Sequence, residues 1–239
     1  MEELAALIRA RKEAIFARIA AAAERSGRRP DSVALMAAVK TRSAEEVAAT
    51  VRAGVGFIGE NRVQEGLAHL QGLDGWHRER MRLHFIGRLQ ANKARKALSS
   101  FASIDSVDGP DLARRLSRLA DEEEIVRSVM LEVNLGEEDQ KGGVPPGEAE
   151  ALARLVLDQE GLLLTGLMGI PPFAQDPEAG RPHFRTLARL FSRIRSLHLD
   201  PDQFVFLSMG MSHDFEVAVE EGATLVRIGS ALYGPRRSS

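Results

Sequence analysis

Short apolar runs alternate with longer amphipathic stretches along most of the chain. Most of the apolar runs are hydrophobic throughout, which is typical of parallel strands that are covered on both faces. The runs predict strands over Val33–Val39, Val55–Gly59, Leu83–Gly87, Ser103–Val107, Ser128–Leu135, Leu162–Ile170, Phe204–Ser208 and Thr224–Gly229. Hydrophobic positions at helical spacing predict helices between them, over Ala44–Ala53, Arg62–Gln71, Lys93–Phe101, Pro110–Glu123, Gly147–Gln159, His183–Leu197 and Asp214–Glu221.

Eight strands that alternate with seven helices predict an α/β fold, a TIM (β/α)8 barrel with few insertions. A doubly wound open sheet is the alternative, but its glycine-rich fingerprint is absent after the first strand, where Lys40-Thr41-Arg42-Ser43 stands. Ser43 and Ser212 are predicted to cap the helices that follow them.

Residues 2–26 precede the first strand and carry apolar residues near helical spacing. They predict an additional helix packed on the barrel, with binding of a partner as the alternative. We therefore expect a single domain over residues 1–239, with the N-terminal helix in residues 1–26 and the barrel in residues 33–234. The loops 136–147 and 171–182 follow strands, so we expect them on the catalytic face, where they can cover a ligand.

Composition excludes several classes of function. The chain is 44% hydrophobic and 28% charged, as in globular proteins with a substantial core. Its net charge of −2 and 5% aromatic content supply neither a basic field nor a stacking platform for nucleic acid. Without cysteine there is no disulfide and no thiolate, and we predict no bound metal. No apolar run approaches the roughly 18 residues of a membrane span, so we expect a cytoplasmic protein without a membrane partner.

Lys40 is the first candidate for chemistry. It closes the uncharged run 33–39, at the strand end where the sites of TIM barrels form. We expect its amine to be partly withdrawn from water, which favours attack on a carbonyl. The alternative is a solvated charge at the end of a strand.

Two glycine- and serine-containing turns are the second candidate. Ser208, Gly210 and Ser212 lie at and just beyond the end of the seventh predicted strand, and Gly229 and Ser230 lie at the end of the eighth. Phosphate commonly binds at these two positions of a TIM barrel, although each turn alone also fits simple turn chemistry. An amine can react with an aldehyde, and a phosphate site opposite it can hold the phosphate group of the same molecule. The combination predicts pyridoxal 5′-phosphate (PLP) as cofactor.

Arg227 lies within the apolar run Leu225-Val226-Arg227-Ile228. A buried guanidinium costs several kcal/mol unless an acceptor meets it. One interpretation is an ion pair with a core carboxylate. The other is a donor to the ring nitrogen of PLP, where a permanent cation opposes protonation and weakens the ring as an electron sink. The second interpretation predicts weak catalytic activity.

The chain resembles the pyridoxal phosphate homeostasis proteins from about residue 5 to Gly234. The motifs that carry the resemblance are Ala38-Val39-Lys40-Thr41, Phe57-Ile58-Gly59-Glu60-Asn61, Gln64-Glu65, His84-Phe85-Ile86-Gly87, Leu89-Gln90-Ala91-Asn92-Lys93, Gly166-Leu167-Met168, Ser208-Met209-Gly210-Met211-Ser212 and Val226-Arg227-Ile228-Gly229. One departure is His213-Asp214, where family members often carry two acidic residues. The family fold resembles the barrel domain of bacterial alanine racemases without the second, β-rich domain.

The resemblance implies a role for each candidate residue. Lys40 would hold PLP as an internal aldimine. Arg227 would face the ring nitrogen, Asn61 and Met168 would line the ring pocket, and His84 would lie close by or serve as a hydrogen-bonded core histidine. The predicted phosphate ligands are Ser208, Gly210, Ser212, Gly229 and Ser230.

The resemblance also implies a function. Family members look like PLP carriers in vitamin B6 homeostasis and amino-acid balance, with apo PLP-dependent enzymes as recipients and no catalytic residues. Racemases use a tyrosine of another domain as second base, whereas the single tyrosine here, Tyr233, follows the last strand. We expect a monomer, because the usual racemase dimer contacts involve that other domain. The alternatives are a racemase-like enzyme and a cofactor-free Schiff-base aldolase.

Overall fold

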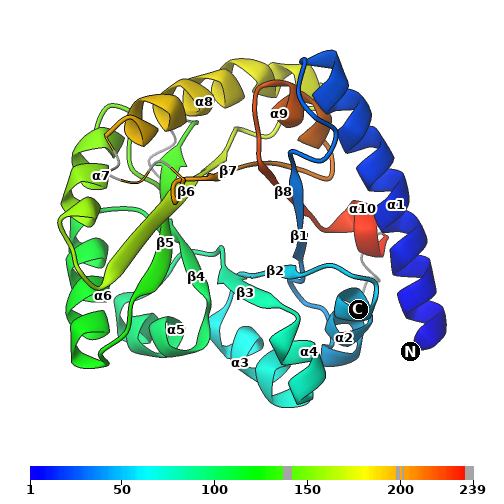
Figure 1. Ribbon diagram of the computed structural model, residues 1–239, viewed down its shortest axis with the longest axis horizontal. Helices are drawn as coiled ribbons and strands as arrows, with labels where there is room; N and C mark the ends of the chain where they lie inside the picture. Colours follow the sequence, from blue (N-terminus) through cyan, green and yellow to red (C-terminus); the bar gives the residue numbers. More distant parts are fainter. Residues whose placement is uncertain (137–141, 198–199, 201, 235–239) are drawn as a thin grey trace.

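Eight parallel strands close into a barrel in the computed structural model of the chain, in the order β1 to β8 (Figure 1). The structure describes residues 1–136, 142–197, 200 and 202–234. Pairing of β1 with β8 closes the sheet and places Met36 opposite Arg227. The strands are β1 Ala34–Ala38, β2 Phe57–Glu60, β3 Arg82–Phe85, β4 Ser103–Val107, β5 Arg127–Asn134, β6 Leu162–Ile170, β7 Phe206–Met211 and β8 Leu225–Ile228. The predicted TIM barrel is confirmed.

Helices form the outer ring around the barrel (Figure 1). They are α1 Glu2–Arg25, α2 Ala44–Arg52, α3 Val63–Gly72, α4 Gly75–Glu79, η1 Ala91–Lys93, α5 Ala94–Ser100, α6 Pro110–Glu122, α7 Ala149–Leu157, η2 Pro177–Gly180, α8 Arg181–Arg195, α9 Phe215–Glu220 and α10 Ser230–Tyr233. Sequence periodicity missed α4, η1, η2 and α10, because elements of one turn are too short to show a helical period. None of the described helices has the length and apolarity needed to cross a bilayer.

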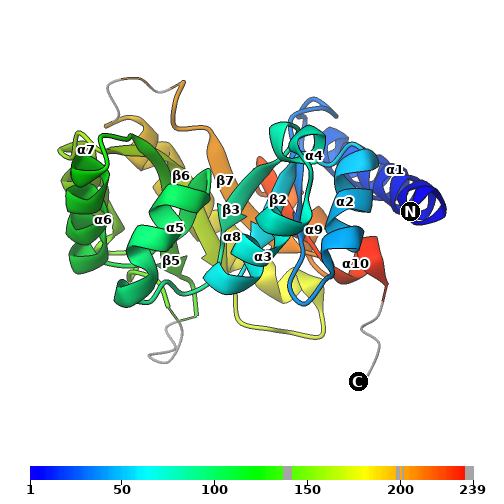
Figure 2. The same ribbon diagram turned by 90° about the horizontal axis from the view of Figure 1, so that it is seen from below.

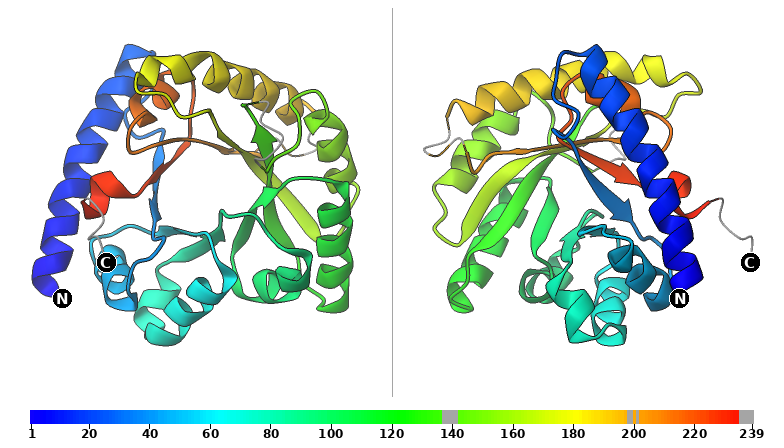
Figure 3. Two further views of the ribbon diagram at one scale, coloured as in Figure 1. Left: turned by 180° about the vertical axis from the view of Figure 1, so that it is seen from behind. Right: turned by 45° about the vertical axis from the view of Figure 1, so that its right-hand side comes forward.

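The predicted N-terminal helix is confirmed as α1, which crosses the outside of the barrel wall (Figure 3). It packs against α2, α9 and α10 and buries Ile8, Ile15 and Ile19. In Figure 2, α10 lies on the same flank, beside α2. Arg18 forms an ion pair with Glu216 of α9 at 2.7 Å, so α1 is held by apolar burial and by a bidentate surface contact.

Met36, Met130 and Leu225 form a small apolar cluster of their own inside the barrel. Gly59 of β2 makes room for it, since an added Cβ would lie 2.7 Å from the Met36 sulfur. The much larger cluster lies between the strands and the helices. Both faces of the sheet are therefore covered, which explains why the strands read as continuous hydrophobic runs.

Strand β7 differs from its prediction at both ends. It begins at Phe206 instead of Phe204 and runs on to Met211 instead of ending at Ser208, so Gly210 belongs to the strand and not to a turn after it. The register with β8 shifts between Ser208 and Met211, and Gly210 has a φ of 87°. A bulge therefore extends this strand, and only the residues beyond it form the loop.

Candidate functional site

A cavity of about 1000 Å³ lies at the carboxyl ends of β1, β2, β6, β7 and β8. Because parallel strands end on the same side, residues far apart in the sequence meet there. The predicted site residues that line it together are Lys40, Asn61, Ser212, Arg227, Gly229 and Ser230. Segment 170–174 and part of η2 also line it, as expected for the loop after β6. Part of the other predicted covering loop, residues 137–141, lies outside the described residues.

Lys40 reaches this cavity from a strained turn. Thr41, the next residue, has a φ of 64°, which is unfavourable for a β-branched side chain. Its hydroxyl donates to the Lys40 carbonyl at 2.6 Å, and its N–H donates to a Glu65 carboxylate oxygen at 3.4 Å. These contacts hold the turn after β1 at the cavity. Lys40 itself is exposed, so the expected withdrawal of the amine from water is not seen.

Ser212 joins the ends of the last two strands. Its Oγ accepts hydrogen bonds from the N–H groups of Gly229 at 3.1 Å and Ala231 at 3.2 Å. The prediction that Ser212 caps the following helix is wrong, because Asp214 is the N-cap of α9 and its carboxylate accepts the Met211 N–H at 2.6 Å. The predicted cap at Ser43 is confirmed, with a reciprocal contact to Glu46.

Arg227 is 4% exposed and is held by neutral acceptors. Nη1 donates to the carbonyl and the hydroxyl of Ser208, both at 2.7 Å, and Nη2 donates to the Gly169 carbonyl at 2.9 Å. No carboxylate among the described residues forms an ion pair with it, so the core ion pair considered above is not present. Burial lowers the pKa of Arg227, and the nearby charge of Glu132 opposes that shift.

The other predicted ligands lie behind the cavity rather than on its wall. Ser208 and Met168 are fully buried and face each other across β6 and β7. The Ser208 hydroxyl is engaged by Arg227. Gly210 lies under α9, where an added Cβ would come within 2.6 Å of the Ala218 Cβ. These residues support the cavity wall through Arg227 and through the end of β7.

His84 does not line this cavity either. It is buried and hydrogen-bonded through Nδ1 to Asp105 at 2.8 Å. The structure thus shows the hydrogen-bonded core histidine that was the alternative interpretation. The described residues contain no group of three or more side chains suited to a metal ion.

Comparison with known proteins shows the family of this chain. The family model "Alanine racemase, N-terminal domain" matches residues 11–237. A pyridoxal phosphate homeostasis protein of Aquifex aeolicus is 41% identical over 223 residues, which are 93% of this chain and 96% of that protein. The protein of the same name from Escherichia coli K12 is 35% identical over 221 residues, 92% of each chain. The chain belongs to the pyridoxal phosphate homeostasis protein family.

Solved structures show the same relationship. PipY of Synechococcus elongatus, determined with PLP bound, superposes with a TM-score of 0.74 at 33% identity, over 90% of this chain and all of PipY. Alanine racemase of Clostridium difficile has a TM-score of 0.69 at 13% identity, over 87% of this chain and 56% of the racemase. The racemase therefore shares the barrel fold alone with this member of the homeostasis family.

Sequence reasoning missed Glu132, a carboxylate that faces the barrel interior from β5. Burial raises its pKa to about 7, and the charge of Arg227 acts in the opposite direction. An added Cβ at Gly142 would lie 3.5 Å from Glu132 Oε2, so the chain after β5 comes close to this carboxylate. The available signal was a single charge inside the apolar run Met130-Leu131-Glu132-Val133, the same signal that singled out Arg227.

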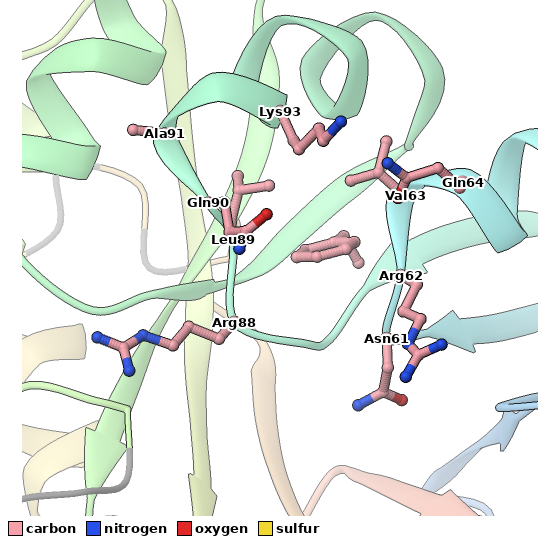
Figure 4. A pocket seen from close by; sticks show the side chains of 10 residues that line it. Asn61, Arg62, Val63, Gln64, Arg88, Leu89, Gln90, Ala91 and Lys93 are labelled. Atoms are coloured by element: carbon pink, nitrogen blue, oxygen red, sulfur yellow. The ribbon is translucent and has the colours of Figure 1, made fainter.

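A second hollow of about 870 Å³ (Figure 4) has one lining residue, Asn61, in common with the first cavity. It carries three cations, Arg62, Arg88 and Lys93. Figure 4 shows the Arg88 side chain pointing away from the other two. The positive groups do not converge on one point, so we assign no ligand to this hollow.

Proposed function

We propose that this chain binds PLP covalently, through a C=N bond between Nζ of Lys40 and the aldehyde carbon of the cofactor, whose oxygen leaves as water. One observation carries the proposal: the Lys40 amine and the Ser212–Gly229–Ser230 group line the same cavity. The PLP named in the PipY structure and the name of the Aquifex relative support it. A volume of about 1000 Å³ at the carboxyl end of a barrel is also ample for a small cofactor.

The residues present fit this cofactor chemically. Ser230 is exposed at the cavity and offers a hydroxyl, while Ser212 fixes the backbone on which Gly229 and Ser230 lie. These groups would hold the phosphate. Arg227 would donate to the ring nitrogen, and Asn61 would contact the ring. When bound, PLP supplies an aldehyde and an electron-withdrawing ring. Direct contacts of Met168, Ser208 and Gly210 with the cofactor stay predictions.

We further propose that the protein holds and delivers PLP in vitamin B6 homeostasis and amino-acid balance, and that it catalyses no reaction. Arg227 supports this, because a permanent cation at the ring nitrogen suppresses the electron sink that catalysis needs. Tyr233 also supports the absence of catalysis. Its hydroxyl is hydrogen-bonded to the Thr50 hydroxyl at 2.8 Å, and the residue does not line the cavity. The same proposal includes four further points. The protein is a single domain, it is cytoplasmic and monomeric, and it delivers PLP to apo PLP-dependent enzymes.

A racemase-like enzyme is the second candidate, because His213 and Asp214 line the cavity and can exchange protons. Incubating the PLP-loaded protein with each amino acid in deuterated water separates the two functions. A carrier leaves the α-hydrogen in place over hours. Enzyme-dependent exchange at the α-carbon, lost in Lys40→Ala, would establish the enzyme instead.

The binding proposal is tested by borohydride reduction of the PLP-treated protein, followed by intact-mass measurement and peptide mapping. We expect one pyridoxyl phosphate adduct on Lys40, its loss in Lys40→Ala, and its retention in the matched control Lys96→Ala, since Lys96 is exposed on α5 and does not line the cavity. An adduct confined to another lysine, or no adduct, would overturn the proposal. A sugar fragment on Lys40 in protein from cells would point to the aldolase.

A further inference from the structure

A separate cavity of about 350 Å³ lies at the opposite end of the barrel. Phe57, Arg82, Ser103 and Phe206, which begin β2, β3, β4 and β7, line it. Since the strands are parallel, this is the amino end, away from Lys40, and the two cavities have no lining residue in common. Arg82 is exposed, so the cavity is reached from solvent. Its volume is near the lower limit of about 300 Å³ for small-molecule sites.

His84 is the most informative residue of this cavity. It is 3% exposed, and its Nδ1 lies 2.8 Å and 3.1 Å from the two carboxylate oxygens of Asp105. A carboxylate can only accept, so Nδ1 carries the hydrogen. The other ring nitrogen, Nε2, has no hydrogen-bond partner among the described residues. A buried imidazole is thus oriented by Asp105, with one polar atom left for a ligand.

Ser103 shows that this group is not a hydrolytic triad. Its Oγ donates to Asp105 at 2.5 Å, on the carboxylate rather than on the imidazole. The Ser103 hydroxyl and the His84 imidazole each donate a hydrogen bond to the same buried carboxylate, that of Asp105. His84 and Ser103 are neighbours in the β3–β4 ladder, but activation of the Ser103 hydroxyl by His84 would need a hydrogen bond between their side chains, and both side chains bond to Asp105 instead. The group is built to hold a histidine in place.

The remaining polar groups favour an anion. Arg82 forms no ion pair with any described residue, and the Ser128 hydroxyl likewise has no partner in the described part of the chain. No carboxylate lines the cavity. Phe57 and Phe206 supply the apolar side, with ring centroids 5.5 Å and 6.4 Å from that of His84. One wall therefore offers a guanidinium, an imidazole and a hydroxyl, and the other offers aromatic edges.

We propose that this cavity binds a small anion, a carboxylate or a phosphate, between Arg82 and Nε2 of His84. Arg82 supplies charge-assisted hydrogen bonds, and a proton shared between Nε2 of His84 and an oxygen of the ligand makes the second contact while Nδ1–H stays on Asp105. Ser128 donates from the side. The aromatic wall formed by Phe57 and Phe206 favours a ligand with a small apolar part. This site is independent of the proposed PLP site.

The test is a titration of ¹⁵N-histidine-labelled protein with sodium phosphate, with sodium acetate and with sodium chloride at matched ionic strength. The His84 resonances are assigned by their loss in His84→Gln. We expect a saturable shift of His84 Nε2 at millimolar phosphate or acetate and none with chloride. The two arms decide which anion class binds. Lys40→Ala is expected to respond like the original protein, because it leaves this end of the barrel intact.

Two variants and one control make the titration decisive. Arg82→Gln is expected to weaken binding by about tenfold or more, because it removes a charged donor. Ser128→Leu fills the cavity and is expected to abolish binding while Arg82 and His84 remain. Arg118→Gln, an exposed arginine on α6, is expected to change nothing. Lack of saturation, an equal response to chloride, or a shift that survives Arg82→Gln unchanged would each overturn the proposal. Arg82 is exposed, so that variant retains the fold.

Discussion

The hydroxyl of Ser212 holds the backbone of Gly229, whose N–H donates to it at 3.1 Å. This contact ties the loop after β7 to the end of β8, directly at the cavity that Lys40 also lines. Ser212 engages the Ala231 N–H as well, so one side chain sets the path of the chain where α10 begins. The proposed phosphate site is therefore one unit built from two strand ends.

Ser212→Ala is expected to weaken PLP binding about tenfold, because two backbone donors lose their acceptor and the Gly229–Ser230 segment is no longer held. Equilibrium titration of the apo protein with PLP, followed by absorbance, measures the effect. Ser212→Thr keeps the hydroxyl and should bind normally. Ser99→Ala removes an exposed serine on α5 and serves as a second control. Equal affinity of the alanine and threonine variants would contradict this role.

Gly210→Ala tests the bulge in β7. The new Cβ would lie 2.6 Å from the Ala218 Cβ and 2.9 Å from the Phe215 Cα, at a φ of 87°. Crowding and the left-handed backbone together are expected to lower the free energy of unfolding by about 2 kcal/mol. Urea denaturation measures it. Gly75→Ala is the control, since its Cβ would meet no atom of the surrounding structure within 4 Å, apart from the adjoining residues and its own helix backbone. If both variants are equally stable, β7 can rearrange and the bulge is not constrained.

Arg227→Gln separates the structural role of the guanidinium from its proposed role at the cofactor. Loss of a charged donor to Ser208 and Gly169 is expected to lower the free energy of unfolding by about 1–3 kcal/mol. With no cation near the ring nitrogen, the absorption spectrum of bound PLP should also change. Arg88→Gln removes an exposed arginine that contacts neither acceptor. Destabilisation with an unchanged cofactor spectrum would leave Arg227 a purely structural role.

Glu132 predicts a pH dependence of stability. Its pKa rises from 4.5 to about 7 in the folded protein, so between these values the folded state binds more protons than the unfolded state. Stability contributed by this group is therefore present at low pH and falls as the pH rises from 4.5 to about 7, by at most about 3 kcal/mol.

Glu132→Gln is expected to remove this part of the pH dependence. The difference in unfolding free energy between the variant and the original protein should grow in favour of the variant as the pH rises from 5 to 7.5. Urea denaturation at a series of pH values measures it. Glu79→Gln, at an exposed carboxylate on α4, should leave the profile unchanged. Parallel profiles for the Glu132 variant and the original protein would show that this carboxylate titrates normally.

The hydrophobic pattern alone determined the barrel. Strands covered on both faces must be apolar throughout, so their number and order were readable, and parallel strands bring their carboxyl ends together. That is why Lys40 and Gly229, at opposite ends of the sequence, were expected at one cavity and are found there. The N-terminal helix was equally readable, because α1 is long enough to show its period.

Tertiary structure decided which polar residues reach that cavity. The seventh strand was predicted to end at Ser208, but the bulge beneath α9 extends β7 through Gly210 to Met211. Of the two serines in this segment, Ser208 is buried and Ser212 lines the cavity. His84 sits on a strand whose register turns it toward Asp105 and the amino end of the barrel. A linear pattern specifies which residues form strands. The side and the depth at which each residue emerges depend on strand register and on the helix packed above, which only the assembled barrel defines.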